Sequence, residues 1–287
     1  MLNSISILFG ISLVLATTTG DQVSEDLPNG QVHRYFLYNR KIYGEEISYD
    51  PQDSGNSGLI EDLPTVIIIH GHRDSYNGSF TQYLTNELVA NENINVIALD
   101  WSEIASMPYS FAQNSVLRIG DYLAAFIANH GINLATTHLI GLDLGAHIAG
   151  VSGRRHFGRI ARITGLSPTT NVVKLTSTDA RYVEVIHTGA ACRHGLTDKL
   201  GHADFYPNGG GFQPGCWTCD CHRNRSWLYF LVSIKTTMFN ANCCNSMLEK
   251  DEDICRGTFL PLGTTRLAKT PCVSGIYRIN TREDFPF

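Results

Sequence analysis

The chain has 287 residues, 17% of them charged, and a formal net charge of −5 at pH 7. This length suits one large α/β domain. The mild negative charge speaks against nucleic acid as a partner, because binding to phosphates needs a basic surface. The short arginine clusters at 154–155 and at 159 and 162 are interpreted as a solvated helix face.

The N-terminal segment has the pattern of a secretory signal. Residues 5–16 are an apolar run followed by small residues. We predict a signal peptide over residues 1–20, and therefore a secreted, extracellular protein. The run is shorter than the roughly 20 residues of a membrane span, so no transmembrane span is expected, and an uncleaved anchor is the alternative. Eight cysteines fit an oxidising compartment.

Strand patterns and helix patterns alternate along the rest of the chain. Continuous apolar runs are typical of buried parallel strands; they lie near 65–70, 95–100, 137–142, 162–166 and 182–188. Helical patterns lie near 79–91, 110–129, 145–157 and 222–240. The alternation predicts an α/β fold, with a mostly parallel central sheet and helices on both faces. Residues 45–62 are polar and predicted to be a loop, and no linker divides residues 21–287, so we expect a single domain.

One strand runs directly into a glycine-spaced turn and a helix. The strand ends in Gly141-Leu142-Asp143-Leu144-Gly145. This spacing is typical of a nucleophile elbow, in which a serine stands between two glycines because the turn is tight. Asp143 occupies the place of the serine. Aspartate is among the residues that tolerate a positive φ, so we expect the turn to be kept.

Further motifs follow in a fixed order and carry a family resemblance. They are Val66-Ile67-Ile68-Ile69-His70-Gly71, Asn95-Val96-Ile97-Ala98-Leu99-Asp100-Trp101-Ser102, Arg162-Ile163-Thr164-Gly165-Leu166-Ser167-Pro168, Val185-Ile186-His187-Thr188, Gly201-His202-Ala203-Asp204-Phe205-Tyr206-Pro207-Asn208-Gly209-Gly210 and Gln213-Pro214-Gly215-Cys216. From about residue 30 onward the chain resembles the pancreatic lipase family, in its branch of insect lipases, phospholipases A1 and yolk proteins. The resemblance implies an α/β-hydrolase fold. Because no sequence follows Phe287, we expect no C-terminal β-sandwich domain of the kind that many members carry.

The resemblance also assigns the site. It places Asp143, Ser167 and Arg223 at the three catalytic-triad positions, and it draws the oxyanion hole from the backbone N–H groups of His72 and Leu144. None of the three triad residues matches the serine, acid and histidine that ester hydrolysis needs. The chain is therefore predicted to be catalytically inactive. The His72 side chain is expected to face solvent.

Two active alternatives stay open at this point. One is a carboxylic ester hydrolase of the lipase or phospholipase A1 type. The other is a hydrolase that uses Asp143 itself as the nucleophile, which still needs a histidine to activate water. His222 is one position from the expected histidine. On a helix that offset turns a side chain by about 100°, so His222 should point elsewhere.

The resemblance implies two disulfides, Cys216–Cys221 and Cys244–Cys255. It leaves Cys192, Cys219, Cys243 and Cys272, of which Cys192–Cys272 is a guess. Cys216-x-x-Cys219-x-Cys221-His222 also has the spacing of zinc ligands, although disulfides suit a secreted chain better. At the family's calcium site Asp179 matches one acidic ligand but Thr176 replaces the other, and Asn171 and Lys174 stand at the remaining positions. We predict no metal and no cofactor.

The charges suggest how an inactive site is held. Asp143 lies at a helix N-terminus, which favours an anion. Arg223 should approach it within about 4 Å, and Ser167 could accept a hydrogen bond from the arginine, leaving a site whose polar groups are all satisfied. Between Cys216 and Cys221 only four residues replace the family's longer lid.

We expect the old cleft to bind a lipid or a small apolar ester, or the protein to bind a protein partner. The resemblance to insect yolk proteins implies a storage or carrier role. Sequons begin at Asn77, in a predicted surface loop, and at Asn224, on a predicted helix.

Overall fold

The computed structural model describes residues 32–49, 58–171 and 173–287. The predicted signal peptide over residues 1–20 lies outside the described residues. The described residues form one compact unit around an eleven-stranded sheet, whose strands lie in the order β10-β9-β11-β8-β7-β6-β5-β3-β4-β1-β2. Among the described helices, none is long and apolar enough to cross a membrane.

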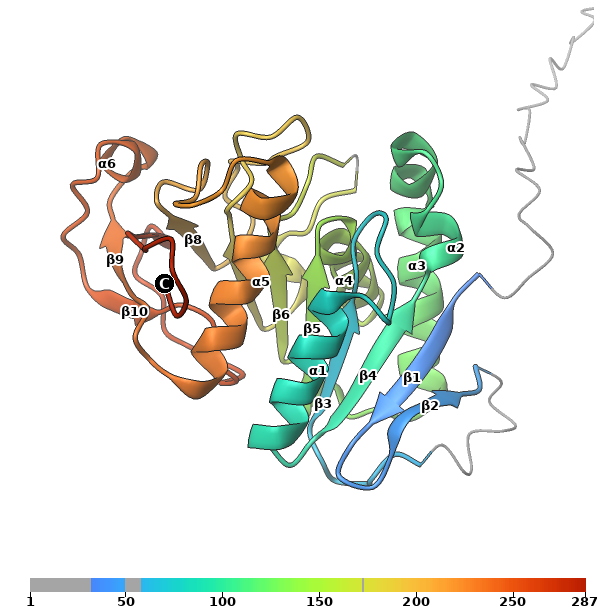
Figure 1. Ribbon diagram of the computed structural model, residues 1–287. Coiled ribbons are helices and arrows are strands. Elements are labelled where there is room, and N and C mark those ends of the chain that lie inside the picture. Colours follow the sequence, from blue (N-terminus) through green and yellow to red (C-terminus); the bar gives the residue numbers. More distant parts are fainter. Residues whose placement is uncertain (1–31, 50–57, 172) are drawn as a thin grey trace, which may run out of the picture. The chain divides into compact units, whose positions relative to one another are not determined.

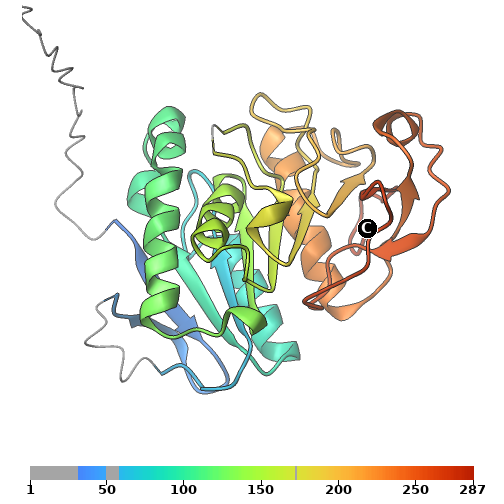
Figure 2. The ribbon, with the colours of Figure 1, turned by 180° about the vertical axis from the view of Figure 1, so that it is seen from behind.

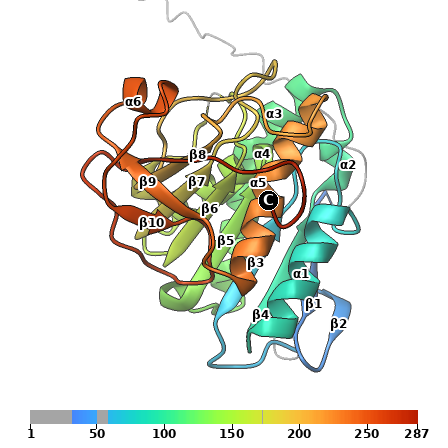
Figure 3. The same cartoon turned by 60° about the vertical axis from the view of Figure 1, so that its left-hand side comes forward.

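The sheet is mostly parallel, as predicted. Its seven central strands pair in parallel, and they are β4 (Asn95–Asp100), β3 (Thr65–Ile69), β5 (Thr137–Leu142), β6 (Arg162–Leu166), β7 (Tyr182–Ile186), β8 (Ala203–Pro207) and β11 (Ile276–Ile279). Antiparallel strands extend the two edges (Figure 3). They are β1 (Arg34–Tyr38) and β2 (Tyr43–Ile47) at one edge, and β9 (Asn240–Cys244) and β10 (Phe259–Pro261) at the other.

Helices cover both faces of the sheet. On one face lie α1 (Ser79–Asn91) and α5 (Cys219–Lys235), in front in Figure 1. On the other lie α3 (Tyr109–Asn129) and α4 (Leu144–Arg155), in front in Figure 2. The described residues also form two short α-helices, α2 (Ser102–Ala105) and α6 (Met247–Asp251). Strands β3 to β7 are buried throughout, which explains their continuous apolar runs.

Three details of the sequence-based prediction are wrong. Residues 45–47 belong to strand β2, which pairs with β1, and not to a loop. Helix α5 begins at Cys219, three residues earlier than expected, because the Thr218 side chain accepts a hydrogen bond from the Cys221 N–H and caps the first turn. It ends at Lys235 and not near residue 240, where strand β9 begins. Arg162 lies fully buried in β6 and not on a solvated helix face.

The burial of Arg162 is explained by a charged cluster at the amino ends of the central strands. Its guanidinium lies 3.1 Å from the Glu184 carboxylate, and Lys269 pairs with the same carboxylate. Arg162 also donates to the carbonyls of Gly263 and Thr264. Burial lowers the pKa of Lys269 to about 8, against the opposing attraction of Glu184. The cluster holds the segment that follows β10 against the amino ends of the central strands.

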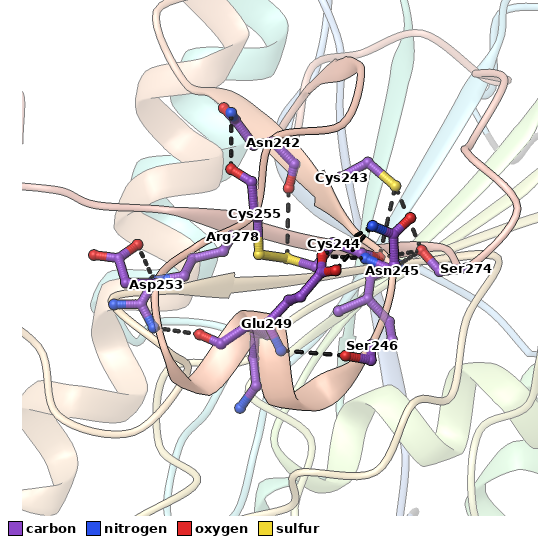
Figure 4. Close-up of a disulfide and its surroundings, with 12 residues drawn as sticks. Asn242, Cys243, Cys244, Asn245, Ser246, Glu249, Asp253, Cys255, Ser274 and Arg278 are labelled. Carbon is purple, nitrogen blue, oxygen red and sulfur yellow. Dashed lines mark hydrogen bonds and ion pairs between the residues drawn. A yellow bond between two sulfur atoms is a disulfide. The ribbon is translucent and has the colours of Figure 1, made fainter.

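Four disulfides join all eight cysteines. Cys216–Cys221 and Cys244–Cys255 are confirmed. The guessed pair Cys192–Cys272 is wrong, because Cys192 bonds to Cys219 and Cys272 to Cys243. The zinc alternative also fails, since each of its cysteines is committed to a disulfide. Figure 4 shows Cys244–Cys255 tying β9 to the segment after α6, where the Asn242 amide donates to the Cys255 carbonyl.

Glu184→Gln tests the buried cluster. Removing the carboxylate leaves two buried cations without their anion, and breaking a buried pair in this way costs about 3–5 kcal/mol. We expect the free energy of unfolding, measured by urea titration, to fall by that order. The same change at the exposed Glu61 is the control, and it should alter stability by less than about 0.5 kcal/mol. Equal effects of the two changes would show that the cluster does not stabilise the fold.

Candidate functional site

Strand β5, at the centre of the sheet, ends in a turn that presents Asp143. The residue has φ 58° and ψ −120°, between the end of β5 and the start of α4. A Cβ on Gly141 would collide with the carbonyl oxygen of Gly145, and a Cβ on Gly145 with that of Ile69. Both glycines are therefore needed for the helix to pass this close to β5 and β3. The tight turn predicted from their spacing is confirmed.

The Asp143 carboxylate is buried and bonded to a neighbouring loop. The residue is 1% exposed. Its Oδ2 accepts a hydrogen bond of 2.9 Å from the backbone N–H of His72, in the turn after β3. Among the described residues its side chain makes no capping bond to α4, and its Oδ1 has no hydrogen-bond partner. The resemblance assigned the His72 N–H to the oxyanion hole, and this N–H already donates its hydrogen bond to the protein's own carboxylate. The other assigned residue, Leu144, begins α4.

Arg223 faces Asp143 from helix α5, as predicted. The Arg223 Nη1 lies 3.8 Å from Asp143 Oδ2, while Nη2 donates to the exposed Asp220 at 2.9 Å. The arginine is therefore shared between a buried and an exposed carboxylate. Its Nε has no partner in the described part of the chain.

Ser167 differs from what was expected. It follows β6 with φ 42° and is buried, and its N–H donates to the Ile186 carbonyl at 2.8 Å. Within the described residues no hydrogen bond joins the Ser167 side chain to Arg223. The guanidinium turns to Asp220 instead, so the prediction that all polar groups of the site would be satisfied is wrong.

The three residues line one cleft of about 200 Å³. The Tyr109 and His194 rings line it and stack on each other with centroids 4.0 Å apart, and the His72 ring meets Tyr109 edge-on. The Tyr109 hydroxyl donates to Thr169 at 2.9 Å, and burial raises the pKa of Tyr109 to about 12, so it is a neutral phenol at pH 7. The disulfide Cys192–Cys219 forms part of the wall.

Several of these wall residues were missed by the sequence analysis. Thr169 and His194 follow strands β6 and β7, and Tyr109 begins α3. Ligand sites of open α/β sheets lie outside the carboxyl ends of the strands, so the loops after β6 and β7 carried a signal that could have been used. His72 was expected to face solvent. It is half-buried instead, and its Nε2 lies 2.9 Å from the Met107 carbonyl.

His222 and Asp179 have other partners. The Nδ1 of His222 accepts the backbone N–H of Gln213 at 2.9 Å, and burial lowers the pKa of this histidine. His222 therefore points away from Asp143, as its helical offset predicted. The Asp179 carboxylate accepts from Arg154 at 2.8 and 3.0 Å and from the Thr176 N–H. It is thus neutralised by an arginine.

The elbow above a mostly parallel sheet, flanked by helices on both faces, defines the α/β-hydrolase fold. The family model described as Lipase matches residues 17–259. The chain belongs to this family, the pancreatic lipase family. It is similar to pancreatic triacylglycerol lipase of Sus scrofa, with 36% identity over 64% of this chain and 45% of that protein. It is also 34% identical to inactive pancreatic lipase-related protein 1 of Homo sapiens, over 72% of this chain and 52% of that protein.

The chain spans about half the length of the curated relatives it matches. A solved structure, Est1E from Butyrivibrio proteoclasticus, overlaps 47% of this chain and 46% of its own, at a TM-score of 0.32 and 14% identity.

A double-mutant cycle tests the Asp143–Arg223 contact. We expect Arg223→Ala to destabilise the wild type more than it destabilises an Asp143→Ser background, because only the former leaves a buried carboxylate without its cation. The coupling should lie between the ~1 kcal/mol of exposed pairs and the ~3–5 kcal/mol of buried ones, since Arg223 is partly exposed. Asp220→Ala, which removes the exposed partner, is the control. Strict additivity in urea unfolding would show that the two groups do not interact.

Proposed function

We propose that this protein is a catalytically inactive member of its family, which retains the cleft and binds a lipid or a small apolar ligand there. Asp143, Ser167 and Arg223 are taken as the three triad positions, all substituted. One observation carries the proposal: a buried carboxylate stands in the elbow and accepts the His72 N–H. An ester oxygen that develops negative charge needs such donors to be free. Here an anion of the protein competes for one of them.

The active alternatives have less support. A guanidinium cannot accept a proton from a nucleophile at pH 7, so Arg223 cannot serve as a general base. An aspartyl ester formed on Asp143 would need a histidine to activate water, and His222 is bonded to Gln213 instead. Both observations favour binding over turnover. Four disulfides fit an oxidising compartment, and with the N-terminal pattern they support a proposal of secretion. A protein partner is the remaining ligand class.

A serine-directed fluorophosphonate probe tests inactivity. We expect no labelling of the purified mature protein, and hydrolysis of short acyl esters, long acyl esters and phospholipids far below about 1 s⁻¹. A triacylglycerol lipase labelled in parallel is the positive control. Stoichiometric labelling, or turnover at ordinary enzyme rates, would contradict the proposal. Mass spectrometry of lipids extracted from the same preparation then tests the binding role.

Restoring the triad residues tests the assignment of positions. Asp143→Ser alone should leave p-nitrophenyl ester hydrolysis near background, because Arg223 remains where a base is needed. Asp143→Ser combined with Ser167→Asp and Arg223→His should raise it measurably. The matched control carries Asp143→Ser and Ser167→Asp and keeps Arg223, so it lacks only the histidine at position 223. Efficient hydrolysis by the single variant would mean that another histidine is poised at the site and that position 223 is misassigned.

A further inference from the structure

Two residues that line the cleft, Asp143 and Arg223, each carry a buried polar atom that has no hydrogen-bond partner among the described residues. Asp143 Oδ2 has the His72 N–H at 2.9 Å and Arg223 Nη1 at 3.8 Å. Asp143 Oδ1 and Arg223 Nε are both buried, and neither has a hydrogen-bond partner in the described part of the chain. Leaving such groups unpaired costs free energy. Both atoms are closed to solvent, so a ligand reaches them only when one of these side chains turns toward the cleft, and a ligand group that then pairs them gains free energy.

The chemistry of the two atoms restricts that ligand group. An ionised carboxylate only accepts hydrogen bonds, and a guanidinium only donates them. Ester and carboxylate oxygens are acceptors too, so Asp143 Oδ1 repels them. A hydroxyl group does both: its O–H donates to Asp143 Oδ1 while its oxygen accepts from Arg223 Nε–H.

An ammonium group fits less well. Its charge would lie beside the Arg223 guanidinium, and an ammonium has no lone pair to accept the Nε–H.

The walls of the cleft restrict the rest of the ligand. The stacked Tyr109 and His194 rings and the Cys192–Cys219 disulfide offer apolar surface, and the Tyr109 hydroxyl is already donated to Thr169. These walls suit a hydrocarbon arm.

We propose that the cleft selects alcohols with an apolar arm over esters and carboxylates. This inference rests on the proposed function and names its ligand class. The residue that stands in place of a nucleophile thereby becomes the residue that determines specificity. The preference is the reverse of what a free pair of N–H donors would give, since those donors would favour carbonyl and carboxylate oxygens.

Three probes with arms of similar length test the proposal in the wild-type protein: 1-octanol, octanoate and methyl octanoate. Binding is followed by isothermal titration calorimetry. We expect 1-octanol to bind at least about tenfold more tightly than either of the others, equivalent to ~1.4 kcal/mol. Equal or tighter binding of octanoate or the ester would overturn the inference while leaving the inactive-binder proposal intact. Absence of binding by all three would overturn it as well.

Asp143→Asn should invert the preference. The amide oxygen has to accept the His72 N–H, because its NH₂ group cannot, so the NH₂ is directed to the place of Oδ1. The side chain at position 143 then offers an N–H donor in the place where Oδ1 was an acceptor. We expect octanoate and methyl octanoate to gain affinity relative to 1-octanol by about tenfold or more.

Asp121→Asn is the matched control. It makes the same chemical change on an exposed carboxylate that pairs with Arg155 and does not line the cleft, and the ligand order should stay as in the wild type. Circular dichroism checks that each variant is folded, and the wild-type series decides the question if Asp143→Asn does not fold. An unchanged order in folded Asp143→Asn contradicts the inference. Release of octanoate from the ester by the wild type contradicts the proposed function instead, so the two failures are distinguishable.

Discussion

The site depends on the close approach of three backbone segments at the centre of the sheet. Strand β5, helix α4 and the end of β3 meet where only glycine fits at positions 141 and 145. The turn between them forces Asp143 to a positive φ and directs its side chain at the His72 N–H. Any residue at position 143 would be presented at the same place. The backbone thus fixes where the side chain stands, and the side chain alone decides what chemistry is offered there.

A carboxylate in that place changes the demands on its surroundings. A serine needs a base to take its proton, whereas an aspartate needs donors and a compensating charge. The His72 N–H and Arg223 provide both in part, and Arg223 is divided between Asp143 and Asp220. These two groups do not satisfy the whole carboxylate, so Asp143 Oδ1 is left buried without a hydrogen-bond partner in the described part of the chain. That unpaired oxygen links the proposed loss of hydrolysis to the ligand preference proposed for the cleft.

The cleft and the opposite end of the sheet are held by different means. Near the cleft, the Cys192–Cys219 bridge ties the loop after β7 to the first turn of α5, the helix that carries Arg223. At the amino ends of the strands, the Arg162, Glu184 and Lys269 cluster fixes the segment after β10. Covalent bonds suit the exposed loops, which have little core of their own, while paired charges are strong only where water is excluded.

The sequence by itself determined the features that depend on local patterns. Continuous apolar runs gave five central strands within two residues at their ends, because burial on both faces leaves no polar alternation. The spacing of Gly141 and Gly145 predicted the turn, since the steric demand lies within a few residues. The helical offset of His222 predicted that it would point away from the site.

The tertiary structure decided what depends on residues far apart in the chain. It brought Arg223 on α5 to Asp143 at the end of β5, and it left Ser167 out of that ion pair. It paired Cys192 with Cys219, and it buried Arg162 against Glu184 and Lys269. None of these is encoded in a local period, because hydrogen bonds, ion pairs and disulfides act over a few ångströms. Whether two side chains come that close is settled only when the sheet, the helices and the loops are packed together.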